Sequence, residues 1–179
     1  TYINIYGGKI TGGVYGGGYG TTRYYVEADA ANKARFLTGA SVYGNTNVNI
    51  YGGDISGGIY GGGAGVAATG AVGTDTEFLN NANDYGTTNV TIDPKTLKPK
   101  SEWADQNIPE YTPDSTWTFT GDIYGGGALG AVKGKTSVII KGGIINGNVF
   151  GAGKGEDGHP DKAKVEGETN VIIDSGWTE

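Results

Sequence analysis

The stretch GNTNVNIYGGDISGGIYGGG, from Gly44 to Gly63, decides the fold because it recurs along the chain. Close copies read TYINIYGGKITGGVYGGG near the start and TSVIIKGGIINGNVFGAG near the end, and shorter copies read TNVTID and TNVIID. Self-similarity of this kind is the signature of a repeat architecture, in which each unit stacks on its neighbours. Every copy begins at one member of a threonine column: Thr1, Thr46, Thr88, Thr136 and Thr169.

Side chains within a repeat alternate with period two, which is typical of a strand. Thr46, Val48 and Ile50 share one face, and Asn47 and Asn49 share the other. The unequal spacing of the repeats favours a β-solenoid, because loops of any length can leave the corners of its rungs. We therefore expect an all-β fold, a right-handed and three-sided parallel β-helix of about four rungs, whose corners are glycines that supply positive φ and allow close stacking.

Stacked rungs lie about 4.8 Å apart, so equivalent residues should fall on one another and form ladders. Ile10, Ile55, Phe119 and Ile145 should form one such ladder on the second side. The sequence predicts two more inward ladders and one aromatic ladder: Val48, Val90, Val138 and Val171; Ile50, Ile92, Ile140 and Ile173; and Tyr15, Tyr60, Tyr124 and Phe150.

The chain is expected to be a single solenoid segment over residues 1–179, excised from a longer array or continuing end to end. Four insertions interrupt it, at 21–41, 66–85, 94–118 and 154–164. The first contains a helix-like centre at 27–36, and the third holds four of the five prolines, as a loop outside the sheets should.

Composition narrows the classes of function. The net charge of −6 disfavours nucleic-acid binding, which needs clustered Lys and Arg. No apolar run approaches the ~20 residues of a membrane helix, so we expect no membrane insertion in this segment. The absence of Cys removes disulfides and thiolate chemistry. No pattern of residues indicates a cofactor, and the glycine strings lack the helix start that a phosphate loop requires.

The best binding candidate is the insertion at 94–118, which carries Trp103, Tyr111 and Trp117. Three large aromatic side chains in one polar, proline-rich loop could contact a ligand. The alternative is a small satellite core that holds the loop onto the solenoid.

Two polar or aromatic columns have a structural alternative to ligand binding. The aromatic ladder could stack on sugar rings, and the column Asn47, Asn89, Ser137 and Asn170 could face ice or a glycan. We favour stabilising stacks and amide ladders along the axis for both columns, since stacked β structure places like residues together by default.

The only candidate catalytic column is Asp93, Lys141 and Asp174. The two carboxylates would lie two rungs apart, inside the range for inverting glycosidases. Lys141 between them would keep both ionised, whereas such chemistry needs an acid with a raised pKa. We therefore expect an exposed ion ladder and assign no catalytic residue.

A calcium site at 156–161 is a weaker possibility. Glu156, Asp157 and Asp161 surround His159, but neither EF-hand spacing nor a calcium-binding nonapeptide is present. We expect a solvated turn there and assign no metal ligand.

The pattern GxTNVxIxGGxIxGxVYGGG resembles the glycine-rich β-helix repeats of large bacterial cell-surface and adhesin-like proteins, including autotransporter passengers. The resemblance covers the rungs and not the insertions, and no site residue carries over. It implies an extracellular or cell-surface location and a non-catalytic structural or adhesive scaffold. Its partners would be further copies of the repeat and surface glycans or host proteins. The alternative is a polysaccharide-active enzyme, lyase or glycosidase-like, since such enzymes also use β-helices.

Overall fold

The computed structural model describes residues 1–20, 40–65, 84–160 and 162–174. The described residues form no α-helix, only strands and one short 3-10 helix, η2 (Lys100–Glu102). All but one of the strand pairings are parallel. The all-β class and the parallel sheets expected from the repeats are confirmed.

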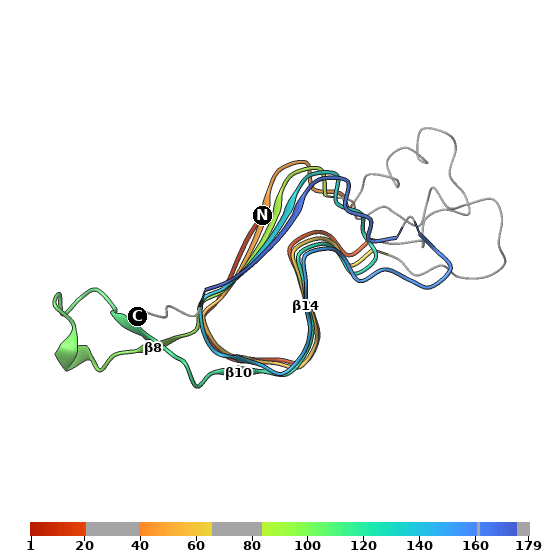
Figure 1. Cartoon of the computed structure of the whole chain (residues 1–179). Coiled ribbons are helices and arrows are strands. Elements are labelled where there is room, and N and C mark those ends of the chain that lie inside the picture. Colours follow the sequence, from red (N-terminus) through yellow and green to blue (C-terminus); the bar gives the residue numbers. More distant parts are fainter. Residues whose placement is uncertain (21–39, 66–83, 161, 175–179) are drawn as a thin grey trace.

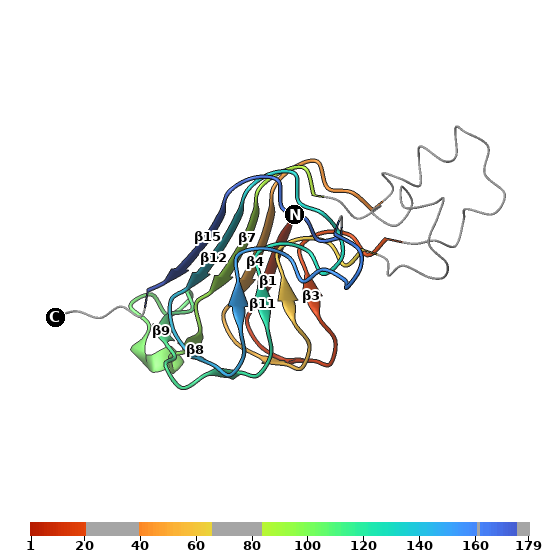
Figure 2. The same ribbon diagram turned by 45° about the vertical axis from the view of Figure 1, so that its right-hand side comes forward.

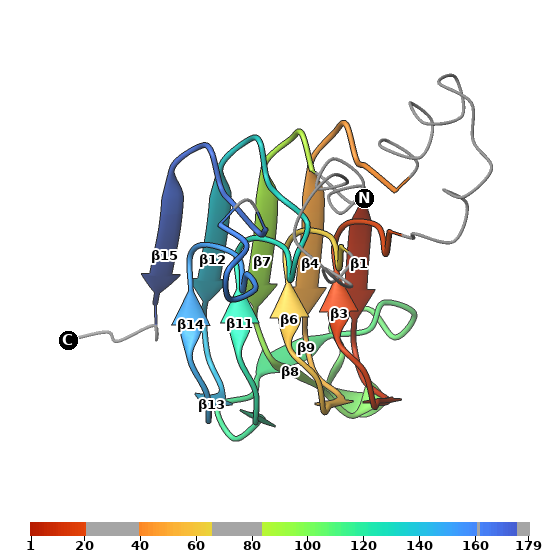
Figure 3. The same cartoon turned by 90° about the vertical axis from the view of Figure 1, so that its right-hand side faces the viewer.

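The largest sheet contains one strand from each repeat, in the order of the chain (Figure 3). Its register pairs like with like: Val48 lies beside Val90, which lies beside Val138, and Val138 lies beside Val171. The isoleucines two residues later follow the same register. The five strands are β1 (Tyr2–Ile5), β4 (Thr46–Ile50), β7 (Thr88–Ile92), β12 (Thr136–Ile140) and β15 (Thr169–Ile173).

Shorter parallel sheets complete each pass of the chain, which we call a rung. A four-stranded sheet contains β3 (Val14–Tyr15), β6 (Ile59–Tyr60), β11 (Ile123–Tyr124) and β14 (Val149–Phe150). Two strand pairs lie between it and the large sheet along the chain: β2 (Lys9–Ile10) with β5 (Asp54–Ile55), and β10 (Thr118–Phe119) with β13 (Ile144–Ile145). Isolated bridges add a further column, formed by Val42, Asp84, Val132 and Val165.

Successive rungs follow nearly the same outline. Figure 1 shows them superimposed, and Figure 2, turned by 45°, separates them along a common axis. The arrangement is compatible with a β-solenoid. The excursion from one rung, residues 94–118, extends away from the stacked outline at one corner (Figure 1).

The core lies inside the rungs and runs along the axis. In β4, β7 and β12 the first, third and fifth residues are buried and the residues between them are half-buried. Phe119 joins this core from β10, beside Ile145 of β13. Each fully buried Val or Ile contributes about 1.5–3 kcal/mol of transfer free energy, so the continuous strip is the main source of stability.

Threonine hydroxyls brace each rung internally. The threonines lie on the buried face with Val and Ile, and each hydroxyl donates to the carbonyl of a corner glycine in the same rung. The pairs are Thr1 with Gly16, Thr46 with Gly61, Thr88 with Gly125, and Thr136 with Gly151. Thr46, Thr88 and Thr136 are buried, and their bonds satisfy hydroxyls whose burial would otherwise be costly.

The corner glycines fall into two kinds, which corrects the expectation that all of them supply positive φ. The second glycine of the doublet does so, with φ of 100° at Gly53 and 80° at Gly143. The triplet corners have a different requirement. A Cβ at Gly61 would lie 2.2 Å from the carbonyl oxygen of Gly125, so the backbones of neighbouring rungs are too close for any side chain.

The insertions are described only in part. Residues 21–39, with the helix-like centre at 27–36, and residues 66–83 lie outside the described residues. Asp84 and Tyr85, which the sequence assigned to the insertion 66–85, follow the rung register instead. Asp84 bridges to Val42 and Val132, and Tyr85 stacks on Tyr43.

Candidate functional site

The excursion at 94–118 is built on an antiparallel stem that leaves the rung directly after β7. The stem consists of β8 (Lys95–Leu97) and β9 (Tyr111–Pro113), and Leu97 lies opposite Tyr111. Backbone bonds extend it at both ends: Lys98 N–H donates to Glu110, and Asp114 N–H donates to Pro94. The stem therefore gives this loop a defined shape.

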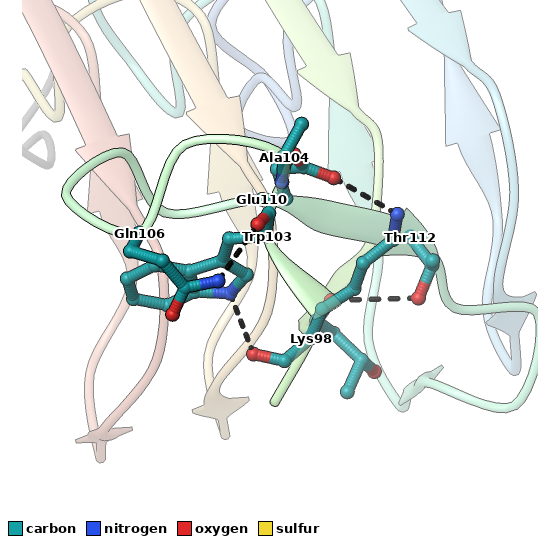
Figure 4. A network of polar contacts seen from close by, with 7 residues as sticks. Lys98, Trp103, Ala104, Gln106, Glu110 and Thr112 are labelled. Carbon is teal, nitrogen blue, oxygen red and sulfur yellow. Dashed lines mark hydrogen bonds and ion pairs between the residues drawn. The ribbon is translucent and has the colours of Figure 1, made fainter. Parts of the chain in front are cut away.

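Trp103 lies inside the tip of the excursion (Figure 4). Its indole N–H donates to the Lys98 carbonyl oxygen at 2.9 Å, and the Gln106 side-chain amide donates to the Trp103 carbonyl at 3.0 Å. The Lys100 ammonium lies 6.0 Å from the ring centroid. The ring is half-buried, so Trp103 serves the packing of the loop.

Glu110 joins the two sides of this tip. Its carboxylate accepts a hydrogen bond from Ala104 N–H and forms an ion pair with Lys98 at 3.0 Å (Figure 4). The Ala104 hydrogen bond and then the Lys98 contact hold the pKa of Glu110 below its usual value. The carboxylate therefore stays ionised and acts as a positioned anchor.

Asp114 closes the base of the excursion. One of its carboxylate oxygens accepts bonds from the Thr116 hydroxyl at 2.7 Å, the Thr116 N–H at 2.9 Å and the Trp117 N–H at 3.1 Å. Thr96 of β8 donates to the other oxygen at 3.0 Å. These bonds, led by those from Thr116, lower the pKa of Asp114.

Trp117 packs against the buried core of the stacked rungs. Its indole N–H donates to the Gly53 carbonyl at 2.8 Å, which connects the excursion to the preceding rung. Its ring lies parallel to Phe119, with 6.2 Å between centroids, and it contacts the buried cluster. Trp117 thus anchors the point where the excursion rejoins the rung.

Tyr111 has an exposed ring near the stem. It lies 6.3 Å from Tyr6, which stacks on Tyr51 at 4.8 Å, and the Lys95 ammonium lies 5.3 Å from the Tyr51 ring. The three aromatic residues predicted as a binding site therefore have separate partners. Trp103 packs in the tip, Trp117 packs on the core and Tyr111 is accessible.

The accessible apolar side chains of the excursion are Tyr111, which the sequence selected, and two residues that it did not select, Leu97 and Ile108. Leu97 and Ile108 are both exposed, as is Tyr111. We call Leu97, Ile108 and Tyr111 the excursion patch. The sequence indicates this patch only weakly, because isolated apolar residues in a polar loop are common on protein surfaces.

The candidate catalytic column keeps its register but has a different ion pair. The backbone N–H groups of Asp93, Lys141 and Asp174 donate to Ile50, Ile92 and Ile140 respectively, so the three residues occupy equivalent positions. The Asp93 carboxylate pairs with Lys95 at 3.0 Å, rather than with Lys141 as expected. Lys95 was overlooked because it belongs to the excursion and not to the repeat.

The aromatic ladder is a continuous stack. Ring centroids are 4.8 Å apart from Tyr15 to Tyr60, 5.0 Å from Tyr60 to Tyr124 and 4.8 Å from Tyr124 to Phe150. Neighbouring rings are nearly parallel, so the ring faces are occupied by one another. Tyr60 and Tyr124 are buried. Sugar stacking needs a free face, and this geometry leaves none on the inner rings.

The asparagine columns are also bonded along the axis. Asn89 donates to the side chain of Asn47 at 3.1 Å, and Asn49 donates to that of Asn4 at 2.9 Å. Such ladders satisfy amide groups between rungs. The side-chain amides of these two asparagine pairs are therefore hydrogen-bonded to each other.

Asp84 is a feature that the sequence reasoning missed. It occupies a column otherwise made of valine, two residues before Gly86, as Val42 precedes Gly44. The side chain is fully buried. One carboxylate oxygen accepts the Gly63 N–H at 2.8 Å, and the other has no hydrogen-bond partner among the described residues. Burial raises the pKa of Asp84 to about 7.

A shallow groove of about 330 Å³ lies beside the aromatic ladder. Tyr15, Tyr60, Leu129 and Lys154 line it, with exposed Tyr19 at its side. Its lining therefore includes tyrosine side chains and one lysine.

No group of three or more potential metal ligands occurs within the described ranges. Asp161 of the acidic turn lies outside them, and Glu156 and His159 form a backbone bridge within that turn. Among the described residues, no helix has the length and apolar character needed to cross a membrane. Comparison with protein-family models, curated proteins and solved structures finds no match for this chain.

Proposed function

We propose that this chain is a non-catalytic structural or adhesive scaffold, a segment of a right-handed, three-sided parallel β-helix. Its setting would be a bacterial cell surface or an extracellular fibre. The carrying observation is the unbroken like-on-like register of the five-stranded sheet, maintained on both sides of a rung that contains a 94–118 excursion. A repetitive body with a projecting element suits a scaffold that presents a binding surface.

The projecting element is the surface that would contact a partner. The excursion is braced internally by Glu110 and Asp114 and is joined to the core by Trp117. This bracing lowers the entropy that ordering a loop would otherwise cost on binding. The excursion patch faces solvent with charged residues nearby, which suits a surface glycan or a host protein.

The end rungs would accept further repeats of the same kind. Val171 and Ile173 of β15 are exposed, although the equivalent valines and isoleucines in β7 and β12 are buried. A further rung in the same register would cover these side chains and pair the free edge of the strand. The proposed partners therefore include more of the same array, within one chain or between chains.

A binding and turnover assay tests this proposal. The chain is immobilised and exposed to a panel of bacterial polysaccharides, animal glycans and extracellular-matrix proteins. We expect retention of at least one of these, reduced at least tenfold by the pair Leu97→Ser and Tyr111→Ser. Tyr43→Ser, which alters an exposed tyrosine outside the excursion, serves as the matched control and should bind normally.

The same assay separates the scaffold from the enzyme alternative. Soluble products of polysaccharide cleavage that form with the native chain and disappear with Asp93→Asn would establish the enzyme. Retention that is unaffected by the paired substitution would remove the excursion patch from the proposal. Antibodies against the chain should label intact source cells if the surface location is correct.

A further inference from the structure

We propose that Tyr43 and Tyr85 form a site of oxidative cross-linking, at which the two side chains couple to dityrosine. The proposal rests on the geometry of this pair and is independent of the proposed scaffold function. It assigns a covalent modification to two residues that belong to successive rungs.

The two rings are held in contact and open to solvent at the same time. Their centroids are 4.7 Å apart and their planes differ by 5°. Tyr43 is 67% exposed and Tyr85 is 40% exposed. The backbone maintains this position, since Tyr85 N–H donates to the Val42 carbonyl at 2.8 Å and Val42 bridges to Asp84.

The other tyrosine stacks are less accessible. Tyr60 and Tyr124 of the aromatic ladder are buried, so a soluble oxidant does not reach them readily. Tyr51 is half-buried and lies under the Lys95 ammonium, although its partner Tyr6 is exposed. Among the tyrosine stacks of the described residues, Tyr43 and Tyr85 are therefore the pair in which both rings are clearly exposed and nearly parallel.

Composition directs oxidation toward aromatic residues. The chain contains neither Cys nor Met, which are the side chains that oxidants usually modify first. It contains 12 Tyr and 3 Trp. Of the described tryptophans, Trp103 and Trp117 are half-buried and hydrogen-bonded.

The coupling step requires a one-electron oxidant, for which we name hydrogen peroxide acting through a haem peroxidase. Each phenol gives up one electron and one proton and becomes a phenoxyl radical. The two radicals join through ring carbons next to the hydroxyl groups, and the displaced ring hydrogens return to the oxygens. One hydrogen peroxide takes up both electrons and both protons and becomes two water molecules. The product has lost two hydrogen atoms and keeps both hydroxyl groups.

The link would join two neighbouring rungs covalently, directly after the bridged residues Val42 and Asp84. It joins positions 43 and 85, which flank a long intervening segment of the chain. A cross-link between distant positions restricts the unfolded ensemble, so the linked protein should unfold at a higher temperature.

The test is oxidation of the purified 179-residue chain with a haem peroxidase and hydrogen peroxide. We expect dityrosine fluorescence, a monomer that has lost two hydrogen atoms, and a cross-linked peptide pair containing Tyr43 and Tyr85 in tandem mass spectrometry. The yield should not depend on protein concentration, because the coupling is intramolecular. Tyr43→Phe should reduce the monomer product at least tenfold.

The matched control is Tyr2→Phe. Tyr2 is 79% exposed, but its register neighbour is Asn47 and not a tyrosine, so this variant should form the link at the native yield. Circular dichroism establishes that both variants are folded. A native yield from Tyr43→Phe, links that map only to other tyrosines, or covalent dimers without a linked monomer would each overturn the assignment.

Discussion

At the scale of single residues, glycines of neighbouring rungs lie too close together to leave room for a side chain. A Cβ at Gly61 would lie 2.2 Å from the Gly125 carbonyl oxygen and 3.1 Å from the Cβ of Thr88. Both obstacles belong to the next rung, and one of them is backbone. A methyl group there cannot be accommodated by turning a side chain.

The first prediction is that Gly61→Ala destabilises the protein by about 2 kcal/mol or more, because the rungs must separate locally. Gly44→Ala is the control. A Cβ at Gly44 meets nothing within 4 Å, so we expect a change within about 1 kcal/mol. Urea unfolding monitored by circular dichroism measures both. Equal effects of the two substitutions would show that close stacking is not the constraint.

The second prediction concerns Asp84. Its folded pKa of about 7 exceeds the ordinary value of 3.8, so the folded state binds this proton more tightly than the unfolded state. This contribution to stability is greatest below about pH 4, declines as the pH rises toward 7 and is lost above it. We therefore expect the native chain to unfold at a lower temperature at about pH 8 than at about pH 5.

Two variants isolate this effect. Asp84→Asn cannot ionise and should lose most of the pH dependence in that window. Asp84→Val restores the valine column and should raise stability at about pH 8 by a few kcal/mol. The carboxylates with lowered pKa values, such as Glu110 and Glu166, change stability only at lower pH. A pH profile of Asp84→Asn that matches the native chain would contradict the assignment.

Residue-level prediction from the sequence succeeded where the repeat itself carried the information. Val48, Val90 and Val138 recur at one place in the motif, and the structure puts them in one register. Asp84 was overlooked because it breaks its column and adjoins a variable insertion. An alignment of the residues two positions before Gly44, Gly86 and Gly134 shows Asp84 in place of the valine found in the other two repeats.

At the scale of elements, the two tryptophans of the excursion have different partners. Trp117 contacts the core and bonds to Gly53 of the preceding rung, whereas Trp103 bonds to Lys98 within the excursion. Trp117 should therefore stabilise the stacked rungs, whereas Trp103 should stabilise only the excursion. Their sequence context, a polar and proline-rich loop, is the same, and for that reason the sequence could not tell them apart.

The third prediction is that Trp117→Ala lowers the free energy of unfolding by about 2 kcal/mol, since it removes partly buried aromatic surface and a hydrogen bond. Trp103→Ala should leave the global transition nearly unchanged and loosen only the excursion. Thermal unfolding reports the first effect, and hydrogen exchange of residues 98–112 reports the second. A larger loss of global stability from Trp103→Ala would reverse the roles assigned here.

At the scale of the whole molecule, stability should depend on position along the axis. Ile92 lies in an interior rung and is fully buried, whereas the equivalent Ile173 is 70% exposed. In a stacked array each rung interacts mainly with its neighbours, so equal substitutions should have unequal effects.

The fourth prediction compares these two positions in the 179-residue chain. Ile92→Ala should cost about 2–5 kcal/mol, through lost burial and a residual cavity. Ile173→Ala should cost less than about 1 kcal/mol, because little of its surface is buried. Urea titration measures both, and a similar cost at the two sites would show that the described rungs do not share one continuous core.

The threonine braces have a practical consequence for protein engineering. The hydroxyl and the carbonyl that it reaches are 15 residues apart in three rungs and 37 apart in the rung with the excursion, yet the bond is made in all four. We therefore expect the position after Asp93 to tolerate inserted peptides of different lengths. A foreign peptide grafted there should be displayed beside the stacked rungs without breaking the threonine bond of its own rung.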